Sequence, residues 1–349
     1  MCGKLRHFAL LLGVCTIDWR VCVTSNVTKL RPDYAMASAA AKRIASFVPR
    51  SPLQRHAEFS AKYNADIHIK KEFLNPVGSF KLRGALNLMQ VLHNSGHKKS
   101  IVTCSTGNHG SAMAYACRQF NVPIIVGVPE DCDSRKAELI RQFGANLRFV
   151  GRDLDDTKEI LQSELDEERQ IFVEDGSSPD VVAGTATIGL ELQEQLPNMD
   201  VVVVPVGNGA LIGGVGAMVK DRMLAAKVVG VYAEKAPCMA LSFDAGKPVD
   251  TESCATFAGG VAVRVAIPAA VQLVNEVVDE MLPVSDENMK AAMAEYYGHS
   301  GELPEGAGAA SLAALSRYPA KFAGRTVCLV ASGANVDEKL RIEVIGRAG

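Results

Sequence analysis

Several absences limit the kind of protein that this sequence can encode. Its nine cysteines form no Cys-X-X-Cys pair, and no cluster of cysteine and histidine has zinc-site spacing. No apolar run reaches the roughly 20 residues that a membrane helix needs. Lysine and arginine (37) do not outnumber aspartate and glutamate (39), so the charge gives no sign of nucleic-acid binding. We therefore expect reduced thiols, no membrane or nucleic-acid partner, and a small-molecule ligand.

The first 36 residues differ from the rest of the chain. They have a basic start, an apolar run over residues 8–14 and no acid before Asp18. We consider an over-long start first, because a good amphipathic helix opens at Met36, then an organellar leader and last a secretion signal. The expected location is cytoplasmic, or mitochondrial or otherwise organellar if the segment is a real leader.

Short apolar runs alternate with helical patterns from about residue 66 onward. Runs this apolar on both faces, separated by helices, predict an α/β protein whose parallel sheet is covered on both sides. In such sheets, ligands gather where strand ends meet loops and helix starts. The predicted strands span residues 101–104, 123–128, 146–150, 171–174, 201–206, 227–233 and 326–331.

The stretch NPVGSFKLRGA, residues 75–85, places a lysine where a helix is expected to begin. A turn leads into Ser79, which we predict to cap the helix, and Lys81 follows between two apolar residues. The helix dipole favours negative charge at this end, so local rules do not explain the lysine. Either Lys81 lies over apolar neighbours at the surface, or its amine is kept partly desolvated for covalent chemistry.

A glycine-bearing loop follows the predicted strand 201–206. Small residues let backbone N–H groups point inward together, and a helix start adds positive potential, which suits a phosphate. A plain tight turn would show the same residues. No acidic residue clearly occupies the place that a dinucleotide site requires. The candidate phosphate-binding residues are Gly207, Asn208, Gly209, Ala210 and Leu211.

Two further loops follow predicted strands. The first, CSTGNHGSAMAY (residues 104–115), offers two hydroxyls, the Asn108 amide and several N–H groups of a helix start, which suit a carboxylate ligand. The second, LVASGANVD (329–337), places Ser332 directly after a strand, where its hydroxyl can meet a heterocyclic nitrogen. Each loop taken alone is equally well explained as a capped helix start.

The combined motifs are far more specific than any one of them. They resemble fold-type II pyridoxal-phosphate enzymes of the threonine/serine dehydratase and serine racemase group, in the tryptophan synthase beta-like family. The similarity runs from about Ala37 to Asp337 in the family's motif order. The matching motifs are SFKLRGA (79–85), STGNHG (105–110), VAGTATIGLE (182–191), the glycine loop, EGAGAA (305–310) and SGANVD (332–337).

The resemblance implies a role for each candidate residue. Lys81 would be the Schiff-base lysine and the base for the α-proton, with Phe80 beside the cofactor ring. Asn108 would bond the 3-hydroxyl of pyridoxal 5'-phosphate, and Ser332 would face the pyridine nitrogen. The N–H groups of residues 207–211 would hold the phosphate. The substrate carboxylate would be held by Ser105, Thr106, Gly107 and the backbone of His109.

The resemblance further implies β-elimination from L-threonine or L-serine, giving a 2-oxo acid and ammonia. Racemases of the group carry a second serine where this chain has Thr106, which can also transfer a proton, so racemisation of serine or hydroxyaspartate is an alternative. A dehydratase of hydroxyectoine breakdown is another alternative, because residues 239–249 are similar to those enzymes. A β-replacing synthase is disfavoured by His109, and a non-catalytic cofactor-binding protein by the intact Lys81 and Ser332.

The resemblance also implies the architecture and the assembly. A larger domain would use residues 37–97 and 179–345, and a smaller inserted domain, residues 98–178, would carry the asparagine loop. Relatives bind a divalent cation through an acid in the position of Glu234 and an aspartate a few residues later. Residues 235–242 contain no aspartate, so we predict no metal site. We expect a homo-oligomer.

Overall fold

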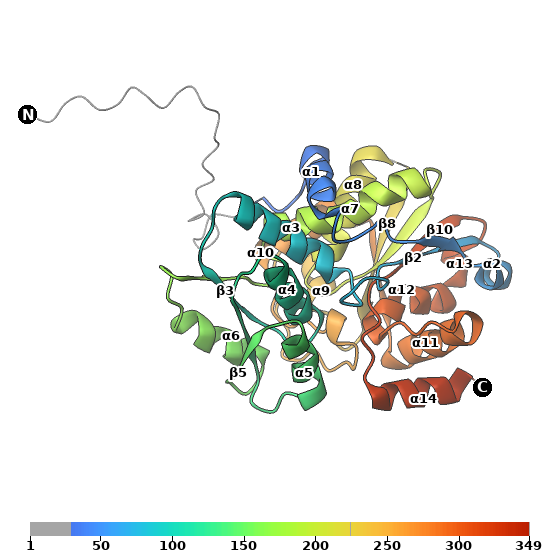
Figure 1. The fold of residues 1–349 in the computed structure, drawn as a ribbon. Helices are drawn as coiled ribbons and strands as arrows, with labels where there is room; N and C mark the ends of the chain where they lie inside the picture. The colour runs from blue at the N-terminus through green and yellow to red at the C-terminus, as the bar shows by residue number, and fades with distance from the viewer. Residues whose placement is uncertain (1–28, 224, 349) are drawn as a thin grey trace, which may run out of the picture.

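The computed structural model describes residues 29–223 and 225–348 (Figure 1). The predictions made for residues 1–28 lie outside these ranges. The described chain begins against the larger sheet's core, because Leu30 is buried there and Arg31 pairs with Asp221 at 2.6 Å. Helix α1 (Tyr34–Ile44) follows, capped by Asp33, whose carboxylate accepts a hydrogen bond from the Met36 N–H.

The larger sheet has six strands in the order β1-β2-β10-β7-β8-β9. All neighbours are parallel except the short edge pair β1–β2. Strand β7 reads VVVVP and is buried at every residue, as expected for a strand covered on both faces. The strands are β1 (Leu53–Arg55), β2 (Asp66–Lys71), β7 (Val201–Pro205), β8 (Lys227–Ala233), β9 (Glu280–Val284) and β10 (Thr326–Ala331).

Helices cover both faces of this sheet and give it two separate cores (Figure 1). One core packs α2, α11, α12 and α14 against the strands, and the other packs α7, α8, α9 and α10 on the opposite face. The helices are α2 (Ala57–Tyr63), α7 (Pro179–Gln195), α8 (Ala210–Arg222), α9 (Cys238–Ala245), α10 (Pro268–Val277), α11 (Asp286–Ser300), α12 (Gly306–Arg317), α13 (Pro319–Phe322), α14 (Glu338–Ala348) and the 3₁₀ turn η2 (Gly259–Val261).

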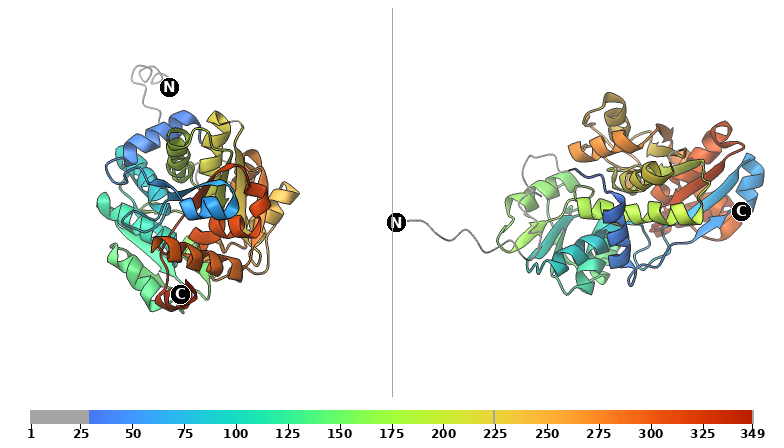
Figure 2. Two further views of the ribbon diagram at one scale, coloured as in Figure 1. Left: turned by 90° about the vertical axis from the view of Figure 1, so that its right-hand side faces the viewer. Right: turned by 90° about the horizontal axis from the view of Figure 1, so that it is seen from above.

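The smaller sheet has four parallel strands in the order β5-β4-β3-β6. Seen from above, it lies beside the larger sheet in the right-hand view of Figure 2. Its elements are β3 (Ser100–Cys104), α4 (Asn108–Gln119), β4 (Ile124–Val128), α5 (Ser134–Gln142), β5 (Asn146–Phe149), α6 (Leu154–Ser163) and β6 (Gln170–Phe172). The predicted α/β class with mostly parallel sheets is confirmed.

Helix α3 (Lys81–Asn94) lies between the two sheets. Its apolar residues Leu82, Leu86 and Met89 are buried in the core of the smaller sheet, while its polar residues reach α7 on the other side. The predicted boundaries assign α3 to the larger domain, and these contacts show that it also packs with the smaller sheet. The division into domains at those boundaries stays a prediction.

All seven strands predicted from the sequence are present, each within two residues of its predicted ends. The sequence analysis did not identify β1, β2 and β9, which are short or interrupted by polar residues. The predicted Ser79 cap is wrong: helix α3 is preceded by Phe80 and has no side-chain cap. Ser79 is instead fully buried and forms a β-bridge with Gly333.

Candidate active site

The candidate residues lie at the carboxyl ends of parallel strands, where ligands bind in open α/β sheets. Lys81 follows β2, the asparagine loop follows β3, the glycine loop follows β7 and Ser332 follows β10. Backbone hydrogen bonds join two of these segments directly. The Phe80 N–H donates to the Ser332 carbonyl at 2.9 Å, and the Ala334 N–H donates to the Gly78 carbonyl at 3.0 Å.

The turn before Lys81 is fixed by its own polar groups. The Asn75 amide donates to the carbonyls of Glu72 and Ser79 at 2.8 and 2.9 Å. Gly78 has a φ of +71°, a conformation that a side chain disfavours. The turn therefore fixes where helix α3 begins. Lys81 lies in the first turn of the helix, and its side chain is 12% exposed. Its Nζ is 5.0 Å from the centre of the Phe80 ring, so the amine is largely enclosed.

The Lys81 amine is bound by a carboxylate that the sequence analysis did not select. Both oxygens of Asp175 lie 2.6 Å from Nζ, and His109 Nδ1 lies 3.4 Å from the same carboxylate. Burial acts to raise the pKa of the Asp175 carboxyl, but the charge of Lys81 and its hydrogen bonds lower it to about 2. Burial lowers the pKa of His109, so its ring is neutral at pH 7.

The Asn108 side chain is held from two directions. Its oxygen accepts a hydrogen bond from the Asn335 amide at 2.7 Å, and its nitrogen donates to Glu305 Oε1 at 2.7 Å. These bonds fix which end of the amide carries the N–H groups, and one N–H is left for a ligand oxygen within the described residues. Burial raises the pKa of the Glu305 carboxyl to about 7.

The glycine loop fits the phosphate that pyridoxal phosphate carries. Gly209 has a φ of +94° and leads into α8 without a side-chain cap. Within the described residues, the N–H groups of Asn208, Gly209 and Leu211 have no acceptor, so they are free to bind an anion at the positive end of the helix. The Ala210 N–H already donates to the Asn208 side chain at 3.2 Å.

The loop predicted to hold a carboxylate is partly exposed. The Ser105 hydroxyl accepts a hydrogen bond from the Gly107 N–H at 3.2 Å, and Thr106 is half-buried between them. The His109 ring is buried against the Thr103 hydroxyl at 3.0 Å, as expected for a structural side chain. The structure thus brings together every predicted segment, while the assigned roles stay predictions.

Three residues at the site escaped the sequence analysis: Asp175, Glu305 and Asn335. Glu305 and Asn335 belong to motifs that carried the resemblance, but no role was given to them. Asp175 follows strand β6 at its carboxyl end, and an acid in that position of a parallel sheet was the available signal. Glu234, considered for a metal, forms an ion pair with Arg317 at 2.6 Å. The described residues contain no cluster of three or more potential metal-binding His, Cys, Asp or Glu side chains.

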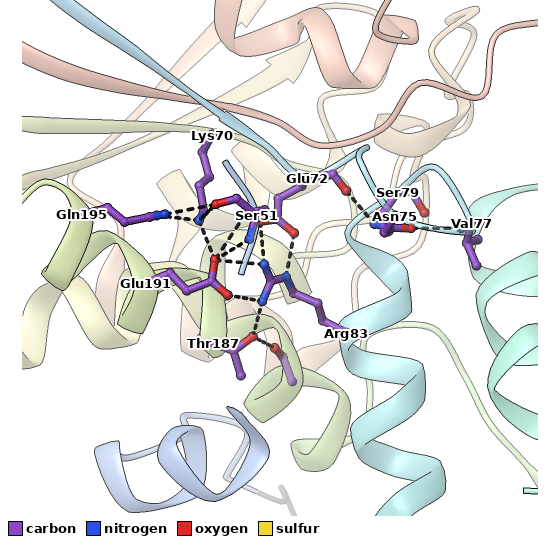
Figure 3. A network of polar contacts seen from close by, with 11 residues as sticks. Ser51, Lys70, Glu72, Asn75, Val77, Ser79, Arg83, Thr187, Glu191 and Gln195 are labelled. Carbon is purple, nitrogen blue, oxygen red and sulfur yellow. Dashed lines mark hydrogen bonds and ion pairs between the residues drawn. The ribbon is translucent and has the colours of Figure 1, made fainter. Parts of the chain in front are cut away.

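A buried polar network anchors helix α3 behind the site (Figure 3). Arg83, two residues after Lys81, is 1% exposed and pairs with Glu72 at 2.7 Å and with Glu191 at 2.6 Å. Burial alone would lower the pKa of the Arg83 guanidinium, but the two carboxylates raise it. Lys70 completes the network, with its Nζ 2.5 Å from Glu191.

Helix α7 supplies one side of this network from a single face. Its residues Thr187, Glu191 and Gln195 are spaced four apart, so their side chains point the same way. Thr187 accepts from Arg83 at 3.0 Å, and Gln195 accepts from Lys70 at 2.7 Å. The two cations and two carboxylates balance, so the network holds the start of α3, and with it Lys81, against α7.

Comparisons with known proteins agree with this geometry. A family profile described as "Pyridoxal-phosphate dependent enzyme" matches residues 44–333. The chain is 33% identical over 315 residues to the L-threonine ammonia-lyase of Geobacter sulfurreducens, covering 90% of this chain and 78% of that protein. Among solved structures, the processed threonine deaminase isoform 2 of Solanum lycopersicum is similar, with a TM-score of 0.83, 28% identity, and coverage of 92% and 96%. Maize serine racemase is similar with a TM-score of 0.84, 25% identity, and coverage of 91% and 98%.

Proposed function

This chain belongs to the family of pyridoxal-phosphate-dependent enzymes, and we propose that it is an ammonia-lyase for hydroxyamino acids such as L-threonine and L-serine. The observation that supports this most is the enclosed Lys81 amine, which lies beside strand-end loops suited to a phosphate and a carboxylate. The resemblance to an L-threonine ammonia-lyase over 90% of the chain agrees with that arrangement.

Bound pyridoxal phosphate supplies an electron sink for the bond that breaks at the substrate's α-carbon. The protein's own groups do the rest. The free N–H groups of the glycine loop would hold the phosphate, and the fixed Asn108 N–H would bond the 3-hydroxyl oxygen of the cofactor. The loop at Ser105 and Thr106 orients the substrate carboxylate. Lys81 takes the α-proton on Nζ, where Asp175 stabilises the resulting positive charge.

The overall reaction needs no oxidant or reductant. The α-carbon loses its proton, and the β-carbon loses its hydroxyl as water, which leaves an enamine. The enamine adds water and releases ammonia, so L-threonine gives 2-oxobutanoate and L-serine gives pyruvate. Because this outcome requires a leaving group on the β-carbon, amino acids without one are not consumed.

The test measures ammonia and 2-oxo acid released by the cofactor-loaded protein from L-threonine, L-serine, D-serine and 3-hydroxyaspartate. Lys81→Ala removes the base, so we expect a loss on the order of 10³-fold. Lys220→Ala is the matched control, because it removes a lysine paired with an aspartate, Asp279, outside the site. Release from none of the four would contradict the proposal, and chiral analysis of the recovered serine would then detect racemisation through Thr106.

We also propose a cytoplasmic location and a homo-oligomeric assembly. The six cysteines of the described residues are free thiols, which is compatible with a reducing compartment. Within the described ranges, no helix has both the length and the hydrophobicity to span a membrane. Light scattering measures the assembly, and a mass near the 37.2 kDa of one chain would contradict it.

A further inference from the structure

An ion pair joins the two parts of the fold. Arg264 lies in the segment between α9 and α10, on the side of the larger sheet, and Asp153 and Asp155 lie at the start of α6, which belongs to the smaller sheet. The Arg264 guanidinium contacts the Asp155 carboxylate and lies 3.7 Å from that of Asp153. The Arg264 side chain is 37% exposed, so this pair is open to solvent, unlike the buried network of Arg83.

Both ends of this pair are anchored in their own part of the fold. The Thr251 N–H donates to the Arg264 carbonyl at 2.8 Å, and the Ala266 N–H donates to the Asp250 carboxylate at 2.8 Å. These two bonds fix the backbone around Arg264. Asp153 caps α6, and α6 packs on strands β3 and β4. The ion pair therefore connects two structured segments rather than two loose side chains.

Both segments lie beside ligand-binding loops. Burial raises the pKa of the Cys104 thiol to about 12, and Asp155 is one of the charged groups close enough to contribute. Cys104 directly precedes Ser105, in the loop assigned to the substrate carboxylate. On the other side, the segment between α9 and α10 includes Gly260. Its carbonyl lies so near Gly207 of the glycine loop that a Cβ added to Gly207 would be 2.5 Å from it. The ion pair thus bridges the surroundings of the two loops.

A bound substrate depends on the separation of these loops. The glycine loop would hold the cofactor's phosphate, and the loop of Ser105 and Thr106 would hold the substrate's carboxylate. The two loops follow β7 and β3, which belong to different sheets, so strand pairing within a sheet does not set the distance between them. A small error in such a distance has a large effect on how a bound ligand is oriented.

We propose that Arg264 is a positioning residue for the substrate. By pairing with the start of α6, it holds the carboxylate-binding loop at the required distance from the cofactor site. This inference rests on the proposed function, because it uses the roles given there to the two loops. Loss of the ion pair should weaken substrate binding but not cofactor binding, since Lys81 and the glycine loop lie outside the smaller sheet.

Calorimetry with L-2-aminobutanoate tests the inference. This amino acid is L-threonine without the hydroxyl, so its binding to the cofactor-loaded protein is measured without elimination. We expect Arg264→Met to weaken this binding about threefold to fivefold, the upper range for an exposed ion pair, and to leave the affinity for pyridoxal phosphate unchanged. Equal binding of the amino acid to both proteins overturns the inference. An equal loss of cofactor affinity overturns it too, as does the absence of any binding to the unaltered protein.

Further variants assign the effect to the ion pair. Arg347→Met is the matched control, because Arg347 is 35% exposed and also pairs with two carboxylates, Glu287 and Glu343, but within α11 and α14. It should leave the binding of the amino acid unchanged. Arg264→Asp should weaken binding more than Arg264→Met, because it repels the start of α6. Adding Asp155→Arg to Arg264→Asp should restore most of the lost affinity. Failure of this reversal, or a loss of affinity in the control, overturns the inference.

Turnover separates this inference from the proposed function. If L-threonine is consumed but Arg264→Met binds L-2-aminobutanoate as the unaltered protein does, the inference fails and the lyase function stands. If the variant weakens that binding but no hydroxyamino acid releases ammonia, the lyase function fails and the positioning role stands. If both hold, Arg264→Met raises KM for L-threonine by the same factor and changes kcat less.

Discussion

Lys81 and Arg83 are two cations on the same turn of α3, but they have opposite environments. Arg83 is 1% exposed and pairs with both Glu72 and Glu191. Lys70 also pairs with Glu191, so each charge has a fixed partner (Figure 3). Lys81 is 12% exposed and has one carboxylate, Asp175, which is itself 30% exposed. The helix thus carries a closed ion network on one side and an open ion pair on the other.

The contrast shows how one helix serves both stability and chemistry. A balanced, fully bonded network fixes a helix rigidly, but its members cannot change partners without a large cost. An open pair can be broken and reformed, as a proton-carrying amine requires. Arg83 therefore fixes the position of α3, and Lys81 uses that fixed position. The following substitutions test this division, from the largest expected effect to the smallest.

Arg83→Met should be the most damaging to folding, because it leaves Glu72 and Glu191 with too little positive charge. Removing one partner of a buried ion pair costs about 3–5 kcal/mol. Lys81→Met is the matched substitution on the same turn, and we expect it to change the free energy of unfolding far less, because Asp175 can be hydrated. Urea unfolding of the cofactor-free proteins measures both. Equal losses would remove the distinction between the two environments.

Glu305, which bonds Asn108 at the candidate site, should determine how the stability of the protein depends on pH. Its folded pKa of about 7 lies above its ordinary value of 4.5, so the folded state binds the proton more tightly. The contribution of Glu305 to the free energy of unfolding is therefore full below pH 4.5 and is lost as the pH rises toward 7. We expect the melting temperature of the cofactor-free protein to fall between pH 5 and pH 8, and to fall less in Glu305→Gln. Asp175 does not contribute in this window, because its pKa is about 2.

If the melting temperature falls equally with pH in the unaltered protein and in Glu305→Gln, Glu305 titrates as it does in water. Glu302→Gln is the control. Glu302 lies three residues before Glu305, accepts a hydrogen bond from the Tyr296 hydroxyl at 2.6 Å and is not bonded to Asn108. It should leave the difference between pH 5 and pH 8 unchanged.

The smallest effect is expected at Arg264, which also pairs with two carboxylates, Asp153 and Asp155. It matches Arg83 in charge and number of partners but is 37% exposed. Exposed pairs contribute about 0–1 kcal/mol, so Arg264→Met should lower the free energy of unfolding by less than 1 kcal/mol. Chemical denaturation of Arg264→Met and Arg83→Met under the same conditions isolates the effect of burial. A loss near that of Arg83→Met would mean that partner number, not burial, decides the cost.

The sequence predicted the parts that depend on local pattern. The strands were readable as apolar runs, and Lys81 stood out because the helix dipole and the capping rules did not account for it. The partners of these residues were not readable. Arg83 pairs with Glu191, 108 residues further on, and Lys81 pairs with Asp175, 94 residues further on. Such pairs depend on how two sheets and α7 are placed, and one sequence contains no signal for that placement.

The Ser79 error has the same origin. A serine before a helix is the commonest cap, so the local rule favoured it. Tertiary structure overrides the rule here, because Ser79 pairs with Gly333 from the far end of the chain and is buried there. Local preference is a weak guide where a distant strand competes for the same backbone.

Strand β10 lies in the middle of the larger sheet, between β2 and β7, although it comes last in sequence among the described strands. Until it is added, β1–β2 and β7–β8–β9 are separate pieces with unpaired edges. The Ser79–Gly333 bridge before Lys81 must also wait for this strand. The larger sheet is therefore incomplete, and exposed to wrong strand pairing, until residues 326–331 have left the ribosome.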